Sequence, residues 1–370
     1  MAPLFSYQPF KALMTLFLLC AAPPCLLFWT IYYTPKALRP NHEWSLGTCI
    51  GNAGLRWWYK YATAIRLGPW LIQGPKDSKS IIEVTPRDVS LYRGVLDHPR
   101  IKPVPKSAIW LPRPYDSAKD TGKPVVLHFQ GGAFVTYGDA AQLGVAPAKA
   151  YEKAFGALTF YAQYRQARDD SSRFPAAVQD VVTFYSYLLS MGVRAKDVFV
   201  AGDSSGGNLV VAFLRYLEEH EGVLPRPGGA LLWSPWVNLN ADFPAVCNTS
   251  AAATDFLPSG LLEWGAKAYG PLPPDVSEDV QAYVSPMGHP FATKTPVWVN
   301  AGSAEIFHND ISEFAKEMEG VAGNRVRYFD SPNMPHDILV GVNVMPVGKE
   351  VEEALQDAVN LFEKGLKGGT

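Results

Sequence analysis

The sequence has little cysteine and little charge. Its 370 residues include four cysteines, none of them in a C-x-x-C pair, so neither a zinc site nor a dense disulfide framework is expected. Charged residues make up 18% and the net charge is −2, which leaves no basic excess to neutralise a nucleic-acid backbone. What is abundant is apolar sequence, at 48% of the chain. This composition excludes disorder over most of the chain and favours one large domain or two small ones.

The longest stretch without charge lies near the N-terminus. Residues 12–33 hold no charged side chain, follow Lys11 and precede Lys36 and Arg39. As a helix, a run of this length would cross the hydrocarbon core of a bilayer, although two adjacent prolines in its middle should kink it. We interpret the N-terminal region, residues 1–40, as carrying a single-pass transmembrane anchor. A cleaved signal peptide and a hydrophobic helix packed on the domain are the alternatives.

The same region bears on the compartment. Asn248 begins the sequence Asn-Thr-Ser, a glycosylation sequon that is usable if the domain is lumenal. The anchor and the sequon together favour the endoplasmic reticulum membrane with a lumenal domain, although the charges beside the anchor do not fix its orientation. In an oxidising lumen Cys49 and Cys247 could pair, and two free thiols are the alternative.

Short apolar runs alternate with segments of helical periodicity through most of the chain. Because strands that alternate with helices build a mostly parallel sheet covered on both faces, the pattern predicts an α/β fold. Strands are expected at 88–92, 107–111, 125–129, 158–162, 198–201, 229–233, 296–301 and 325–329, and helices at 146–155, 176–191, 208–219, 311–319 and 349–366.

Two segments fall outside this alternation. Residues 41–100 begin with aromatic-rich sequence that predicts one or two amphipathic helices over 40–75. These aromatic side chains either pack on the main core or form a cap over an active site. Residues 240–290 are rich in proline and helix-prone. We predict cap or lid helices in 41–100, and a main domain at 101–370 that carries a cap insertion at about 240–290.

The strongest chemical motif is G-D-S-S-G-G-N at residues 202–208. It follows a predicted strand and opens a predicted helix, which is the context that a nucleophile elbow requires. Such a turn would lift the Ser204 hydroxyl above the sheet, while the helix N-terminus would offer N–H groups to an oxyanion. The alternative is a glycine-rich turn whose serine caps the helix. We predict Ser204 as a catalytic nucleophile.

A second glycine motif directly follows an earlier predicted strand. Residues 130–134 read Q-G-G-A-F and lie about 70 residues before the nucleophile, where an oxyanion loop belongs. An ordinary turn between a strand and a helix is the alternative. We predict an oxyanion hole built from main-chain amides of Gly131, Gly132, Ala133 and Ser205.

A serine nucleophile needs a base, and the base needs a carboxylate that orients it. In this fold both follow the serine in the chain, with the acid before the histidine. Glu305 lies in the loop after the predicted strand 296–301, and His336 lies in the loop after the last predicted strand. We predict Glu305 as the acid and His336 as the base, with Asp310 as a reserve acid and His308 as a surface residue.

Taken together, these motifs resemble the hormone-sensitive-lipase-like branch of the α/β-hydrolase family, and within it the fungal membrane-anchored esterases of the steryl acetyl hydrolase type. Ser204 matches the serine of the family motif GDSAGGN, with Ser205 in place of alanine. The loop 130–134 matches HGGGF, except that Gln130 replaces the histidine and Ala133 the third glycine. The resemblance covers about residues 100–345 and includes segments 164–165, 174–180, 232–236 and 283–286.

The resemblance implies an α/β-hydrolase fold with a helical cap, and an esterase in which Glu305 replaces the usual aspartate. We therefore predict a serine carboxylesterase or acetylesterase that forms an acyl-enzyme and needs no metal or organic cofactor. The aromatic cap and the anchor favour apolar ester substrates, such as sterol-like, terpenoid or secondary-metabolite esters. Two alternatives stay open. One is a non-hydrolytic cyclisation or condensation enzyme of fungal secondary metabolism, for which Gln130 leaves room, and the other is an inactive binding module.

Overall fold

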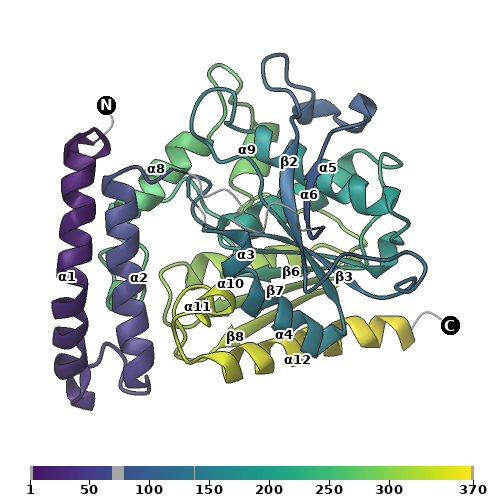
Figure 1. Ribbon diagram of the computed structural model, residues 1–370. Helices are drawn as coiled ribbons and strands as arrows, with labels where there is room; N and C mark the ends of the chain where they lie inside the picture. Colours follow the sequence, from purple (N-terminus) through teal and green to yellow (C-terminus); the bar gives the residue numbers. More distant parts are fainter. Residues whose placement is uncertain (1–2, 69–78, 137, 368–370) are drawn as a thin grey trace.

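The computed structural model describes residues 3–68, 79–136 and 138–367, with side chains as far as residue 363. Its centre is an eight-stranded sheet with the order β1-β2-β4-β3-β5-β6-β7-β8 (Figure 1). The strands are β1 (Ile81–Val84), β2 (Lys106–Leu111), β3 (Val125–Phe129), β4 (Leu158–Ala162), β5 (Val198–Asp203), β6 (Gly229–Trp233), β7 (Val297–Gly302) and β8 (Val326–Ser331). β2 is antiparallel to both of its neighbours, and the strands from β4 to β8 in the sheet order are parallel. The carboxyl ends of the parallel strands therefore meet at one edge, where sites of such sheets lie.

Helices cover both faces of the sheet, as the alternating sequence predicts. The helices of the domain are α3 (Ala140–Leu143), α4 (Val145–Phe155), α5 (Ala176–Ser190), α6 (Ser205–Glu219), α7 (Phe243–Val246), α8 (Ser259–Tyr269), α9 (Glu278–Val284), α10 (His308–Glu319), α11 (Ile338–Gly341) and α12 (Gly348–Lys367). α4 and α12 pack on one face, and α5, α6 and α10 on the other. The central strands are buried on both sides, so they are nearly continuous apolar runs.

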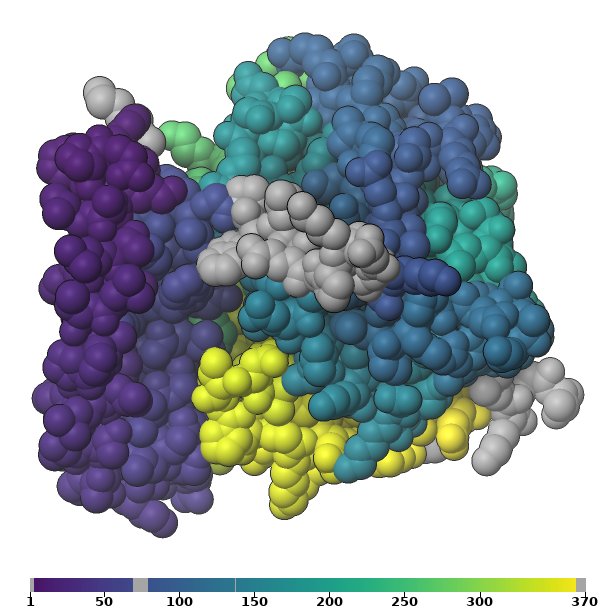
Figure 2. All heavy atoms as spheres, viewed as in Figure 1, coloured from purple at the N-terminus to yellow at the C-terminus, as the bar shows by residue number. Residues whose placement is uncertain are grey.

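Two long helices near the N-terminus lie side by side at the flank of this domain (Figure 1). α1 (Phe10–Tyr33) continues as one helix through Pro23 and Pro24, so these prolines do not end it. Its length and its mean hydropathy of 2.0 are sufficient for a membrane span, and none of its most apolar stretch is buried. Figure 2 shows α1 as the outermost layer of this flank.

α2 (Leu46–Ala64) lies between α1 and the domain. The contacts between the two helices include a hydrogen bond of 2.8 Å between Thr15 and Tyr61 and the edge-to-face rings of Trp29 and Trp57. α2 also packs against α8, in the segment expected as a cap insertion. The side of α2 that faces away from α1 therefore meets the domain near the edge where the parallel strands end.

The structure corrects two details of the sequence analysis. Residues 88–92 form a single 3₁₀ turn rather than a strand, because the Asp88 carboxylate accepts the Ser90 amide locally. β1 lies inside the segment 41–100 and belongs to the main sheet, so the predicted cap does not extend to residue 100. Within the described part of 40–75 there is one helix, α2, while residues 69–78 lie outside the described residues. The thiols of Cys49 and Cys247 are both free.

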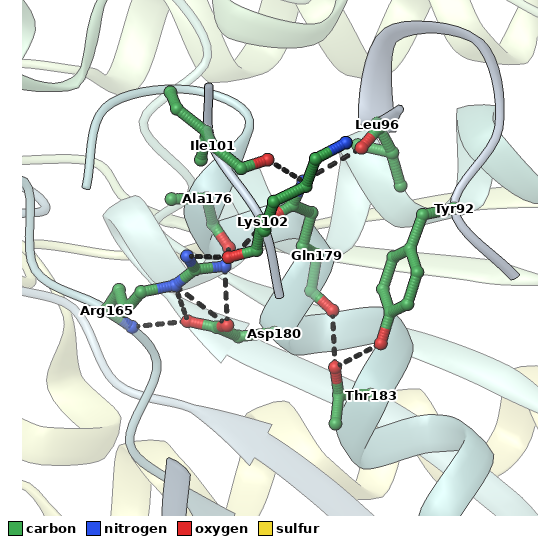
Figure 3. Close-up of polar contacts among 9 residues, drawn as sticks. All are labelled: Tyr92, Leu96, Ile101, Lys102, Arg165, Ala176, Gln179, Asp180 and Thr183. Atoms are coloured by element: carbon green, nitrogen blue, oxygen red, sulfur yellow. Dashed lines mark hydrogen bonds and ion pairs between the residues drawn. The ribbon is translucent and has the colours of Figure 1, made fainter. Parts of the chain in front are cut away.

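A buried ion pair holds the loop after β4 against α5 (Figure 3). The Arg165 guanidinium pairs with the fully buried Asp180 carboxylate at 2.9 Å and also donates to the carbonyl of Lys102. Beside it, the Gln179 amide donates to the carbonyls of Leu96 and Ile101. These bonds satisfy buried polar groups of three separate segments and fix the irregular chain before β2 to the domain.

Candidate active site

The turn between β5 and α6 presents Ser204 in a conformation that few residues adopt. Ser204 has φ 52° and ψ −118°, and its amide donates to the Trp233 carbonyl. The turn is tight because a Cβ on Gly206 would lie 1.9 Å from the Phe129 carbonyl oxygen, and one on Gly202 would lie 2.4 Å from the Gly206 backbone. The glycines of the motif are thus required by close backbone approach. The strained turn directs the Ser204 side chain toward a cavity at the sheet edge.

His336 and Glu305 meet at the ends of β8 and β7, which are parallel neighbours. His336 Nδ1 lies 2.9 Å from Glu305 Oε2, and both side chains are at most 2% exposed. Burial lowers the pKa of the imidazole, but the hydrogen bond to Glu305 and the charges of Glu305 and Asp255 outweigh it and raise the pKa to about 9. The carboxylate is therefore placed to orient the ring and to stabilise an imidazolium.

Side chains from two other segments surround the His336 ring. Phe256 and Phe307 each contact it edge to face, with ring centroids 5.7 and 5.5 Å away. Asp255 is buried beside them and accepts the amides of Leu257 and Ile306. Burial raises the pKa of Asp255, while the positive charge of His336 lowers it. The sequence offers no signal for Asp255, because a lone aspartate in an insertion has no motif around it.

Ser204 and His336 line the same cavity. Among the residues that the structure describes, no hydrogen bond joins the Ser204 hydroxyl to the imidazole. Catalytic hydrogen bonds of this kind are often long in ligand-free enzymes and shorten when substrate binds. The structure therefore brings the three predicted catalytic side chains to one edge of the sheet, with the acid–base contact already formed.

The loop after β3 offers fewer oxyanion donors than the sequence suggests. The Gly131 amide donates to the Asp203 carboxylate at 2.6 Å and is therefore not free to bind an oxyanion. The prediction that Gly131 belongs to the oxyanion hole is wrong. Gly132 and Ala133 line the cavity, and within the described residues their amides have no acceptor. The Ser205 hydroxyl accepts the Phe134 amide at 3.2 Å and so ties this loop to the start of α6. The available donors are thus the amides of Gly132, Ala133 and Ser205.

Asp203 is a further polar residue of the motif, and its role is not visible from the sequence alone. Besides the Gly131 amide, its carboxylate accepts His128 Nε2 at 2.8 Å, and both side chains are buried. Burial lowers the pKa of His128 to about 3, so this ring is neutral. A histidine inside the apolar strand β3 is the one sequence signal that could have revealed this buried network.

The cavity at this edge has a volume of about 430 Å³ and mostly apolar walls. Part of the wall comes from α2, through Leu55, Trp58 and Tyr59. Another part comes from the 240–290 segment, through residues that include Phe256 and Leu261. The two segments predicted to form a cap therefore contribute much of the apolar wall, and residues of the main domain complete the cavity around Ser204.

α2 is held in place on the cavity by polar and aromatic contacts. Arg56 donates to the carbonyls of Ala252, Ala253 and Asp255, and the Tyr59 ring stacks on Phe256 at 5.6 Å. The helix passes so close to the chain before α12 that a Cβ on Gly51 would lie 2.5 Å from the Val344 carbonyl oxygen. Because Phe256 also contacts His336, this helix is linked to the His336 ring through one intervening ring.

The remaining predicted residues lie outside the reacting centre. Asp310 is in the first turn of α10. Burial raises the pKa of its carboxyl group, and a hydrogen bond from Asn238 offsets part of this increase. His308 begins the same helix and pairs with Asp330 at 3.4 Å. Asn248 is exposed after α7, so the sequon is accessible, and its glycosylation stays a prediction.

Comparison with known proteins is consistent with this architecture. A family model described as alpha/beta hydrolase fold matches residues 126–340. An acetyl-hydrolase of Streptomyces hygroscopicus is 29% identical over 239 residues, which is 64% of this chain and 75% of the relative. An esterase of Acinetobacter venetianus is 28% identical over 149 residues, which is 40% of this chain and 46% of that protein.

Solved structures share the same fold at lower identity. A crystal structure of an esterase from the bacterial hormone-sensitive lipase family is 21% identical, has a TM-score of 0.61 and covers 85% of this chain and 99% of its own. The thermostable carboxylesterase EstE1, cloned from a metagenomic library, is 19% identical with a TM-score of 0.60, over 84% of this chain and 96% of its own. At these identities the likeness concerns the fold.

Proposed function

The chain belongs to the alpha/beta hydrolase fold family, and on that premise we propose that it is a serine ester hydrolase. The observation that carries the proposal is the 2.9 Å hydrogen bond between His336 and Glu305 at the wall of a cavity that also receives the Ser204 side chain. A hydroxyl, an imidazole and a buried carboxylate are the three groups that acyl transfer by a serine requires. The names of the relatives, acetyl-hydrolase and esterase, point to the same reaction class.

In the proposed reaction His336 Nε2 removes the Ser204 proton as Oγ attacks the ester carbonyl. Glu305 holds Nδ1–H and stabilises the imidazolium that forms. The amides of Gly132, Ala133 and Ser205 bind the oxyanion, and loss of one such donor typically costs about 3 kcal/mol of transition-state stabilisation. His336 then protonates the departing alcohol, and water, activated by the same imidazole, releases the acid from the acyl-serine.

The proposed substrate is an acetyl or other short acyl ester of an apolar alcohol. The apolar walls from α2 and from the 240–290 segment leave few polar groups to bind a charged or sugar-like alcohol. A sterol-like, terpenoid or secondary-metabolite ester suits this surface, because its transfer from water is driven by buried apolar area. The acetyl-hydrolase among the relatives favours a small acyl group.

We also propose that α1 attaches the protein to a membrane, with the catalytic domain in the lumen of the endoplasmic reticulum. α1 is 24 residues long with a mean hydropathy of 2.0, and its exposed side chains include many of Leu, Phe and Ile. α2 contacts α1 on one side and lines the cavity on the other. A membrane-bound α1 would therefore keep the cavity close to the lipid in which apolar esters dissolve.

The proposal is tested by replacing Ser204 with alanine. We expect Ser204→Ala to abolish turnover of p-nitrophenyl acetate and butyrate and labelling by a fluorophosphonate probe, because both need the nucleophile. Ser190→Ala is the matched control, since that exposed serine only bonds the Tyr187 carbonyl at the end of α5. Turnover that survives in Ser204→Ala would refute the assignment. Wild-type protein that neither turns over esters nor reacts with the probe would instead favour a non-hydrolytic enzyme or an inactive binding module.

A further inference from the structure

Asp337, the residue after the proposed base, has a left-handed backbone conformation, which is uncommon for residues other than glycine. Its φ is 49° and its ψ 71°, in the left-handed region where a Cβ is unfavourable. Its amide donates to the Ser234 hydroxyl at 2.9 Å, and its side chain is buried. A glycine would adopt this conformation more easily, whereas aspartate brings a buried carboxyl group to this position, where it also caps α11 through the Val340 amide.

The Asp337 carboxyl meets a second buried carboxyl. It is hydrogen-bonded to Asp203, and both line the cavity beside the proposed catalytic groups. Asp203 directly precedes Ser204, and Asp337 directly follows His336. The contact therefore joins the two segments that carry nucleophile and base, one residue away from each. Two carboxyl groups in contact share one proton, since two buried negative charges would repel each other strongly.

The hydrogen bonds around the pair place that proton on Asp337. Asp203 accepts two strong donors, the His128 ring at 2.8 Å and the Gly131 amide at 2.6 Å, and both favour its ionised form. Asp337 accepts the Val340 amide, at 3.3 Å, and no other donor among the described residues. Burial and the negative charge of Asp203 raise the pKa of Asp337 well above its ordinary value. The neutral carboxyl is thus the donor, and Asp203 is the acceptor.

The hydrogen bonds that lead from Trp233 to Asp203 all agree with a protonated Asp337. Trp233 Nε1–H donates to the Tyr151 oxygen at 3.1 Å, which leaves the Tyr151 hydroxyl to donate to His128 Nδ1 at 3.2 Å. His128 therefore carries its proton on Nε2 and donates it to Asp203. Asp203 ends as a carboxylate that accepts from His128, Gly131 and Asp337. Each donor in the chain has one acceptor, so a protonated Asp337 completes the network rather than competing with it.

We propose that Asp337 is a positioning residue: a neutral carboxylic acid whose O–H donates to Asp203 and thereby fastens the His336 loop to the Ser204 turn. Through the Gly131 amide, the same Asp203 carboxylate holds the start of the oxyanion loop. One buried hydrogen bond thus sets the relative placement of nucleophile, base and oxyanion donors. This inference rests on the proposed esterase function, because the bond acts on groups that matter only if Ser204 and His336 react.

Several titratable groups face the Asp337 side chain. Asp203 on β5 and His336 beside it are the nearest, and Tyr59 on α2, His128 on β3, Tyr151 on α4 and Tyr161 on β4 also lie within electrostatic range of its carboxyl group. Burial raises the pKa of the three tyrosines and lowers that of His128, so all four stay uncharged near neutral pH. The charges near Asp337 are therefore those of Asp203 and His336.

The test compares Asp337→Ala, Asp337→Asn and the wild type in full-length protein, using kcat and KM for p-nitrophenyl acetate across pH. Alanine removes the donor, so kcat should fall on the order of 100-fold with little change in KM, because nucleophile and base lose their alignment. Asparagine keeps an N–H donor toward Asp203 and an oxygen for Val340, so it should recover most of the lost kcat. Asp242→Ala is the matched control, since Asp242 caps α7 through the Ala245 amide away from the cavity.

The charge state is tested by the acidic limb of kcat/KM, which reports the ionisation of the base. If Asp337 is neutral, Asp337→Asn changes no charge beside His336 and leaves that limb at the wild-type pH. A limb that moves to lower pH would show that an ionised carboxylate had been removed, and would overturn the inference. Wild-type kcat in Asp337→Ala would overturn it as well. If thermal unfolding shows that the alanine variant is not folded, the acidic limb of the asparagine variant still tests the inference. Activity that persists in Ser204→Ala would instead refute the proposed function itself.

Discussion

Replacing Glu305 with glutamine should move the pH dependence of catalysis in a direction set by the His336–Glu305 contact. The contact is a 2.9 Å hydrogen bond between buried groups, and a bond to a charged partner is typically worth about 1.5–3 kcal/mol. At 1.36 kcal/mol per pKa unit, its loss should lower the pKa of His336 from about 9 by roughly 1–2 units. Asp255 remains in Glu305→Gln and should keep part of the upward shift.

The sign of the effect follows from which form of the imidazole reacts. Glu305 stabilises the imidazolium, whereas the free imidazole is the base, so wild-type kcat/KM should rise with pH until the ring is deprotonated near pH 9. In Glu305→Gln that rise should occur at lower pH. At the same time kcat should fall by on the order of 10³–10⁴, because the glutamine amide can donate to Nδ1 and favour the wrong tautomer.

The measurement is the initial rate of p-nitrophenyl acetate hydrolysis from roughly pH 5 to 10, corrected for spontaneous hydrolysis, with kcat and KM resolved at each pH. Glu313→Gln is the matched control, because Glu313 is an exposed carboxylate on α10 that only pairs with Lys316. An acidic limb of Glu305→Gln that coincides with that of the wild type would refute the reasoning, since the carboxylate would then have no influence on the base.

Two further predictions concern stability and membrane attachment. Asp180→Ala leaves the largely buried Arg165 without its carboxylate, so the free energy of unfolding should fall by about 3–5 kcal/mol, and a loss below about 1 kcal/mol in denaturant titrations would contradict this. Wild-type protein should stay with membranes after alkaline carbonate washing. The double change Leu16→Arg and Leu27→Arg on the exposed side of α1 should release it, because placing each arginine in the bilayer centre costs about 2.5–3.5 kcal/mol. Val276→Arg, on an exposed apolar residue far along the chain, is the control, and wild-type protein in the supernatant would contradict the membrane proposal.

Local sequence determined most of the sheet and the motif at its centre. The apolar runs at 125–129, 158–162 and 229–233 coincide with β3, β4 and β6, because a strand buried on both faces needs an almost unbroken apolar run. The α/β fold expected from this alternation is confirmed. The glycines around Ser204 also allowed the turn to be predicted from the sequence, since a strand-to-helix turn this tight excludes side chains at fixed positions along the chain.

The errors of the sequence analysis arose where local hydrogen bonds compete with a pattern. Residues 88–92 have the composition of a strand, but the Asp88 carboxylate binds the Ser90 amide and closes a turn. Gly131 has the spacing of an oxyanion donor, but its amide is taken by Asp203 from a strand about 70 residues away. In both cases the outcome depended on which acceptor was nearest, and spacing along the chain carries no information about that.

What the sequence by itself determined about this protein is most of its strands and helices, the long apolar helix near the N-terminus and the residues on which the proposed serine hydrolase rests. Tertiary structure alone decided which side chains share hydrogen bonds: His336 with Glu305, Asp203 with His128 and Asp337, and α2 with the loop that touches the base. The physical reason is that periodicity and turn chemistry act over a few residues, whereas the proton positions and pKa values of buried groups are set by partners brought together only when the sheet forms.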